Sequence, residues 1–154
     1  MPASRRAEAE ALARHLVERF APHELATFEL EAAPCLRDPR GMMKAYTRTD
    51  DTALGSGLSS VIATFTPAAA LVASAALGAL GQSIAVSATA RLKAGVQRLR
   101  GRSAQAAPVA APQQEELRAI HRRSLETAMA LGFDEHKARA VADAVLAALV
   151  VDRA

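Results

Sequence analysis

The stretch TFTPAAALVASAALGALGQSIAVSATARLKAG, from Thr64 to Gly95, decides how this sequence folds. It carries no charged side chain between Thr64 and Ala90 and becomes basic at Arg91. A membrane-spanning helix needs roughly 20 mostly apolar residues, and this stretch is long enough for one. A helix that is apolar on all sides can equally be the central helix of a soluble domain. Fold and function both depend on what covers this stretch.

The composition predicts an all-α protein. The 154 residues are 51% hydrophobic, but only 3% are aromatic and none is tryptophan. Alanine and leucine, which are common among the apolar residues, are the best helix formers, whereas strands favour aromatic and β-branched side chains. A chain of this length suffices for one domain with a modest core. Cys35 is the single cysteine, so we expect no internal disulfide.

The first 51 residues predict short amphipathic helices followed by a connector. We expect one helix at Ser4–Phe20 and a second at His23–Ala33, where Pro34 should end it. Within the connector that follows, Met42–Thr47 is predicted to be a short extended piece. The apolar face of the first helix is made by residues spaced four apart: Leu12, Leu16 and Phe20.

Residues 52–100 form the apolar central segment with a basic end. Thr66 is expected to cap a helix whose first residue is Pro67, because proline suits the first turn. This helix is predicted to run to about Arg100, either as one long Ala/Gly/Ser-rich helix or as one arm of a hairpin. Residues 101–112 follow as an alanine- and proline-containing linker.

The C-terminal residues predict a helical hairpin. Its helices are expected at Gln113–Leu131 and Glu135–Val151. Gly132 is a suitable helix stop, and Asp134 is a suitable cap for the second helix. The chain therefore divides into four segments: 1–51, 52–100, 101–112 and 113–154.

Two patterns around the central segment favour a membrane. Small residues recur along it at helical spacing, and such stripes allow helices to approach closely in lipid, which predicts a homo-oligomer. This predicted membrane and oligomer face consists of Ser74, Ala75, Gly78, Ala79, Ser83 and Ser87. Basic residues then follow the apolar run directly, as they do where a membrane helix leaves on the cytoplasmic side. The residues expected to contact lipid head groups are Arg91, Lys93, Arg98, Arg100 and Arg102.

We therefore favour a small membrane-associated protein whose central helix inserts and self-associates, as an anchor or a membrane-disrupting effector. The other predicted helices are short, so they offer the central segment little cover. In this hypothesis the basic flank is cytoplasmic, and the outer helices bind an unidentified partner protein. The alternative is a soluble, cytoplasmic all-α adaptor or assembly protein that buries the central helix in its own core or in a complex.

The sequence argues against an enzyme. Its four histidines are not paired at a metal-binding spacing, Cys35 stands in no nucleophile motif, and no two carboxylates suggest a catalytic pair. We therefore predict no catalytic residues, no metal and no cofactor. Nucleic acid is also disfavoured as a partner, because the basic residues are almost without the aromatic neighbours that stack on bases.

One local resemblance concerns the C-terminal hairpin. The stretch AMALGFDEHKARAVADAVLAAL, from Ala128 to Leu149, resembles the first two helices of a ubiquitin-associated-type domain. In that family a helix ends in a Met/Leu-Gly-Phe turn, and here Leu131-Gly132-Phe133 stands at the turn. The third helix of the family has no counterpart before Ala154. The resemblance implies that Leu131 and Phe133 form an exposed protein-binding turn, and it does not extend to ubiquitin binding.

Overall fold

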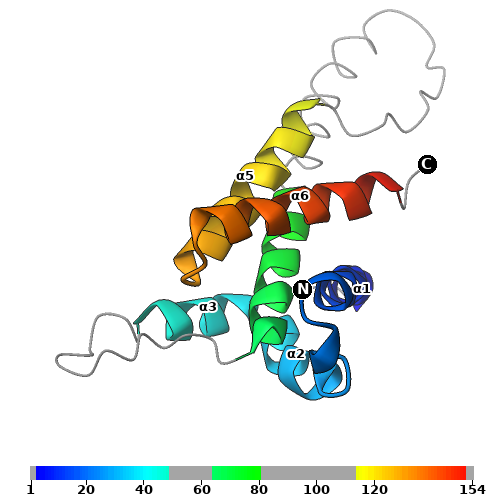
Figure 1. Ribbon diagram of the computed structural model, residues 1–154, viewed down its shortest axis with the longest axis vertical. Helices are drawn as coiled ribbons and strands as arrows, with labels where there is room; N and C mark the ends of the chain where they lie inside the picture. Colours follow the sequence, from blue (N-terminus) through cyan, green and yellow to red (C-terminus); the bar gives the residue numbers. More distant parts are fainter. Residues whose placement is uncertain (1–2, 49–63, 81–113, 152–154) are drawn as a thin grey trace, which may run out of the picture.

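The computed structural model describes residues 3–48, 64–80 and 114–151, and nearly all of these residues lie in helices (Figure 1). The described part of the chain contains no strand, which confirms the all-α prediction. The elements are α1 (Ala3–Phe20), the 3-10 helix η1 (Pro22–Glu24), α2 (Phe28–Arg37), α3 (Pro39–Arg48), a central helix over residues 65–80, α5 (Gln114–Ala130) and α6 (Glu135–Val151). The continuation of the central helix to Arg100 lies outside the described residues.

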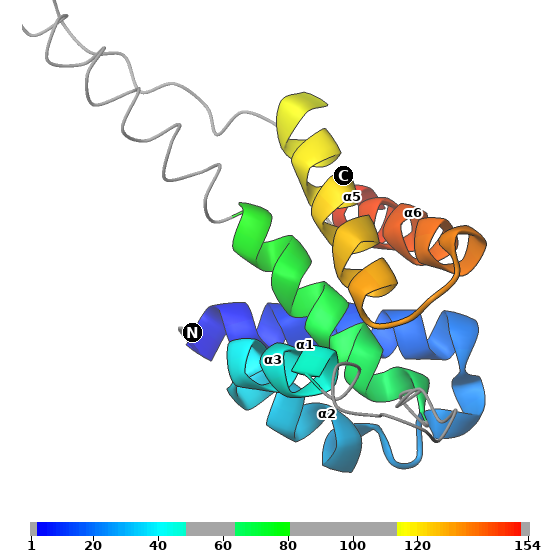
Figure 2. The same cartoon turned by 90° about the vertical axis from the view of Figure 1, so that its left-hand side faces the viewer.

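The central helix lies between the N-terminal helices and the α5–α6 hairpin, as both views show (Figures 1 and 2). The hairpin helices pack on each other, and α6 also contacts α1. On the other side, α2 packs against α1 and α3. Buried apolar residues from all three described parts of the chain form one continuous core cluster.

This arrangement buries the described part of the apolar segment. Between residues 65 and 80, only Ala75, Gly78 and Ala79 are partly accessible, and every other residue is buried. Val72 and Ala73, for example, have no exposed surface at all. The flanking helices were expected to be too short to bury the central helix. In the structure they bury residues 65–80 together, because helices from both ends of the chain pack around them. Among the described residues, no helix combines the length and the apolar character that crossing a bilayer requires.

The second helix differs from the prediction, because Pro34 lies inside α2 instead of ending it. Proline has no backbone N–H, so the Leu30 carbonyl loses its usual helical partner. Burial of Cys35 and Leu36 just beyond the proline offsets this loss, since both side chains join the core. The Pro34 carbonyl still accepts a hydrogen bond from the Asp38 N–H at 3.1 Å, which completes the last turn.

The extended piece predicted at Met42–Thr47 is wrong, because these residues belong to α3. The Asp38-Pro39 pair begins this helix: the Asp38 carboxylate accepts a hydrogen bond from the Gly41 N–H at 3.0 Å, and proline suits the first turn. Three side chains then hold α3 against the core: Met42, Met43 and Tyr46. The Asp38-Pro39 pair, which falls within the predicted connector, is here the start of a helix.

The C-terminal hairpin confirms its prediction closely. Gly132 has a φ of 88°, a left-handed conformation that glycine adopts without steric penalty. The Phe133 N–H donates to the Ala128 carbonyl at 3.2 Å, which closes the end of α5. Asp134 then caps α6 by accepting a hydrogen bond from the Lys137 N–H at 2.9 Å. Local backbone chemistry is thus sufficient to set this turn.

Two glycines should respond to alanine in opposite directions. A methyl group at Gly78 would meet no atom within 4 Å, so Gly78→Ala is expected to stabilise the fold by about 0.5–1 kcal/mol through the unfolded state. Gly132→Ala should destabilise it by about 1–2 kcal/mol, because its φ is positive. Urea denaturation of the two variants measures both effects. A loss of stability in Gly78→Ala would contradict the open space described beside this helix.

Candidate functional site

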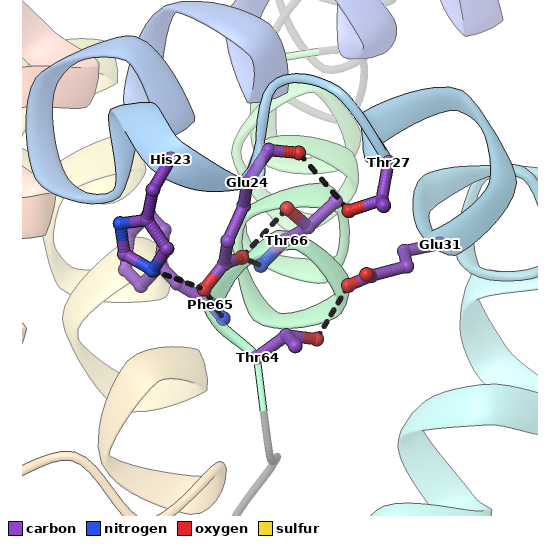
Figure 3. Close-up of polar contacts among 7 residues, drawn as sticks. All are labelled: His23, Glu24, Thr27, Glu31, Thr64, Phe65 and Thr66. Carbon is purple, nitrogen blue, oxygen red and sulfur yellow. Dashed lines mark hydrogen bonds and ion pairs between the residues drawn. The ribbon is translucent and has the colours of Figure 1, made fainter.

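A buried carboxylate holds the start of the central helix (Figure 3). Glu24, at the end of η1, has only 9% of its surface exposed. Its Oε1 accepts a hydrogen bond from the Phe65 N–H at 2.8 Å, and its Oε2 accepts one from the Thr66 N–H at 2.7 Å. The Thr66 hydroxyl also donates to Oε2, at 2.8 Å. We call this group, Glu24 with Phe65 N–H and Thr66, the Glu24 clamp.

The Glu24 clamp satisfies donors that every helix leaves free. The first N–H groups of a helix have no partner within it, and they carry the positive end of the helix dipole. Phe65 and Thr66 supply two such groups, and Pro67 has none to supply. The prediction that the Thr66 side chain caps this helix is therefore corrected: Thr66 lies within the first turn, and the capping carboxylate comes from η1.

The surroundings of Glu24 act on its charge in opposite directions. Burial raises the pKa of Glu24, but the hydrogen bonds from the Phe65 and Thr66 backbone and the Thr66 hydroxyl, together with nearby His23, bring the pKa below its ordinary value of 4.5. The His23 Nε2 lies 3.8 Å from Oε1 and is largely exposed. Beside the clamp, the Thr64 hydroxyl donates to Glu31 (Figure 3). The clamp therefore holds an ionised carboxylate at neutral pH.

An aromatic stack joins the same end of the central helix to both ends of the chain. The Phe65 ring lies 5.7 Å from that of Phe20, at the end of α1, and 5.7 Å from that of Phe133, in the α5–α6 turn. The Lys137 ammonium lies 4.9 Å from the Phe133 ring and 5.5 Å from the Phe65 ring, within range of a cation–π interaction. Phe65 thus connects three separate parts of the sequence.

The predicted membrane and oligomer face is only partly within the described residues. Ser74 is buried, and its hydroxyl has no hydrogen-bond partner in the part of the chain that the structure describes. Ala75, Gly78 and Ala79 form the half-buried strip of the central helix. Two further members of the predicted face, Ser83 and Ser87, lie outside the described residues. Self-association through this face stays a prediction.

Some of the other predicted site residues lie outside the described part of the chain, and others lie within it. The residues expected at lipid head groups all lie outside the described part of the chain: Arg91, Lys93, Arg98, Arg100 and Arg102. The turn predicted to be exposed is instead packed into the protein, because Leu131 is only 7% exposed and Phe133 stacks on Phe65. Leu131 is buried and Phe133 is half-buried against the core, so the expectation that both side chains are exposed is corrected.

A surface groove on α2 was missed by sequence reasoning. It is lined by Glu29, Leu30, Ala33, Pro34 and Arg37. Leu30 is 80% exposed, more than the other large hydrophobic residues that the structure describes as exposed. The sequence did contain an indication of this groove, because Leu30 does not lie on the helix face that carries the buried residues Phe28 and Ala32. Once Pro34 is taken to end the helix, however, the groove cannot be recognised, because Arg37 then lies beyond it.

Two further observations concern the metal-ligating side chains of the described residues and the single cysteine, Cys35. No group of three or more His, Cys, Asp or Glu side chains in those ranges is arranged to hold a metal ion. Cys35 is 1% exposed, and burial raises the pKa of its thiol to about 11. Because the thiolate is the reactive form, the thiol should be inert at neutral pH.

This inertness is a testable consequence of the burial of Cys35. In the folded protein at pH 7.5, a disulfide-exchange reagent should modify Cys35 at least about 100 times more slowly than in 6 M urea, since both exposure and ionisation are suppressed. The measurement is the absorbance of released thiolate with time. Equal rates in buffer and in urea would show that the Cys35 thiol is accessible to the reagent. The side of α2 that carries Cys35 would then not be buried.

The chain matches no known protein family model, no curated protein and no solved structure. The resemblance of residues 128–149 to a ubiquitin-associated-type domain therefore receives no support from these comparisons.

Proposed function

We propose that this protein is a non-enzymatic helical adaptor or assembly protein that keeps the first part of its apolar central helix in its own core. The observation that supports this proposal is the burial of residues 65–80 by helices from both ends of the chain. In this view the longer apolar segment expected up to Arg100 begins inside a folded bundle, and the outer helices present the surfaces that contact other proteins.

Burial of residues 65–80 in the protein core favours this function over their insertion into a membrane. Side chains such as Leu71 and Val72 are already removed from water by their neighbours, and lipid is no more apolar than a protein core. Moving them into a bilayer would therefore gain little. It would also break the Glu24 clamp and leave the apolar faces of α1 and α6 exposed to water, which is unfavourable.

Cell fractionation of the full-length chain, followed by a carbonate wash of the membranes, tests this proposal. The adaptor function predicts that the protein is recovered in the soluble fraction and elutes as a discrete helical species. Ala79→Arg, on the half-buried strip, should leave this distribution unchanged. Retention of the wild-type protein in washed membranes, with release by Ala79→Arg, would overturn the proposal in favour of a membrane-inserting anchor or effector.

A further inference from the structure

The groove on α2 combines an exposed apolar centre with opposite charges at its two ends. Leu30, Ala33 and Pro34 form the apolar centre, and Glu29 and Arg37 flank it. The two charged residues are eight positions apart, or about 12 Å along the helix axis. Glu29 is 84% exposed on its side chain and makes one long contact, 3.4 Å to Arg14. Its carboxylate can therefore accept a second cation.

This pattern is complementary to itself under a two-fold rotation. Glu29, Ala33 and Arg37 lie four residues apart and so form one ridge of the helix surface. If two α2 helices pack antiparallel with Ala33 at the crossing point, Glu29 of each copy faces Arg37 of the other. The same operation places Leu30 of one copy over the Ala33–Pro34 surface of the other. A two-fold interface requires this reciprocal relation, in which one residue contacts a second and the second contacts the first.

We propose that α2 is the contact between two copies of this chain, which associate as a symmetric antiparallel dimer through the α2 groove. The small Ala33 side chain allows close approach at the crossing point, and burial of Leu30 supplies the apolar contribution.

The size of this surface sets the strength of the dimer. A single short helix contributes it, so the buried area falls below the roughly 1,000 Å² of a stable interface. The dimer is therefore weak and reversible, with a dissociation constant on the order of 100 µM. Since two ion pairs flank its centre, it weakens as salt screens them. A groove without charges of opposite sign at its two ends would not be complementary to a second copy of itself.

Charge reversal with sedimentation velocity tests this inference on the full-length chain, at up to about 1 mM protein and low salt. Glu29→Arg alone places arginine against Arg37 twice in the dimer, and Arg37→Glu alone places glutamate against Glu29 twice. Each single variant should lose dimerisation at least about tenfold. The Glu29→Arg/Arg37→Glu double variant should restore it, because both pairs are re-formed in reverse.

Mixing gives the sharpest result. The Glu29→Arg chain and the Arg37→Glu chain, each monomeric alone, should form a mixed dimer of about wild-type affinity, since both of its ion pairs are then attractive. Met129→Lys is the matched control, because Met129 is an exposed apolar residue on another helix, and it should dimerise normally. Circular dichroism confirms that each variant is folded.

The α2 dimer rests on the proposed adaptor function, but separate experimental outcomes would overturn the dimer and the adaptor function. A wild-type chain that stays monomeric at the highest concentration, or single variants that dimerise as well as wild type, would overturn the α2 dimer and leave the adaptor function standing. A mixture that does not associate would also overturn it. Retention in carbonate-washed membranes would instead overturn the adaptor function itself.

Discussion

Phe65→Ala is expected to lower the free energy of unfolding by about 3–5 kcal/mol, the largest loss among the variants considered. The side chain is only 7% exposed, stacks on the Phe133 ring and contacts the Phe20 ring in a tilted arrangement. Its removal would leave a cavity where η1, the central helix and the α5–α6 turn meet, and would also remove the contact with the Lys137 ammonium. Chemical denaturation followed by circular dichroism measures the loss.

Two further variants identify the origin of this effect. Met129→Ala removes an exposed apolar side chain and should change stability by less than about 0.5 kcal/mol. Phe65→Leu restores much of the volume but not the stacking, so it should recover part of the loss. If Phe65→Ala were no more destabilising than Met129→Ala, the aromatic stack would not connect the three parts of the chain.

Glu24→Ala is expected to cost about 2–4 kcal/mol. The substitution removes a carboxylate that accepts three hydrogen bonds and leaves the N–H groups of Phe65 and Thr66 buried without that partner. It also removes the anion that the helix dipole favours at this end. Glu18→Ala, on the exposed face of α1, is the matched control and should have little effect. A similar loss in both variants would contradict the clamp.

The same carboxylate predicts a pH dependence with a defined sign. The pKa of Glu24 is lower in the folded protein than its ordinary value of 4.5, so the unfolded chain binds the proton more readily. The stability it contributes is present in full above the ordinary pKa and is lost as the pH falls through the lower, folded value. Wild type should therefore lose its advantage over Glu24→Gln as the pH falls below the ordinary value of 4.5. A constant difference between pH 7 and pH 3 would contradict this.

The sequence predicted those elements whose ends depend on neighbouring residues. The bounds of α6 agree with the prediction, and those of α1 and α5 differ from it only by a residue, because Gly132, Asp134 and the four-residue spacing in α1 act locally. Pro34 and α3 were misjudged because local rules were applied without their tertiary context. A proline is tolerated within α2 when the residues after it are buried, and burial is not visible in a helix-breaking signal.

The candidate site was harder to predict, because its contacts join residues distant in sequence. The sequence suggested a cap at Thr66, but a short 3-10 helix supplies the capping Glu24. Leu131 and Phe133 were expected at the surface, but Leu131 is buried and the half-buried Phe133 stacks on Phe65, which is distant in sequence. The cover of residues 65–80 likewise depends on helices that are each too short to suggest it alone.

The position of Phe65 also has a consequence for synthesis of the protein. Ribosomes make the chain from its N-terminus, so α1, α2 and the central helix emerge before α5 and α6. Until Phe133 and the apolar face of α6 have left the exit tunnel, the nascent chain presents one side of residues 65–80 to water. During that interval the exposed surface is of the kind that chaperones bind, and completion of the α5–α6 hairpin ends it.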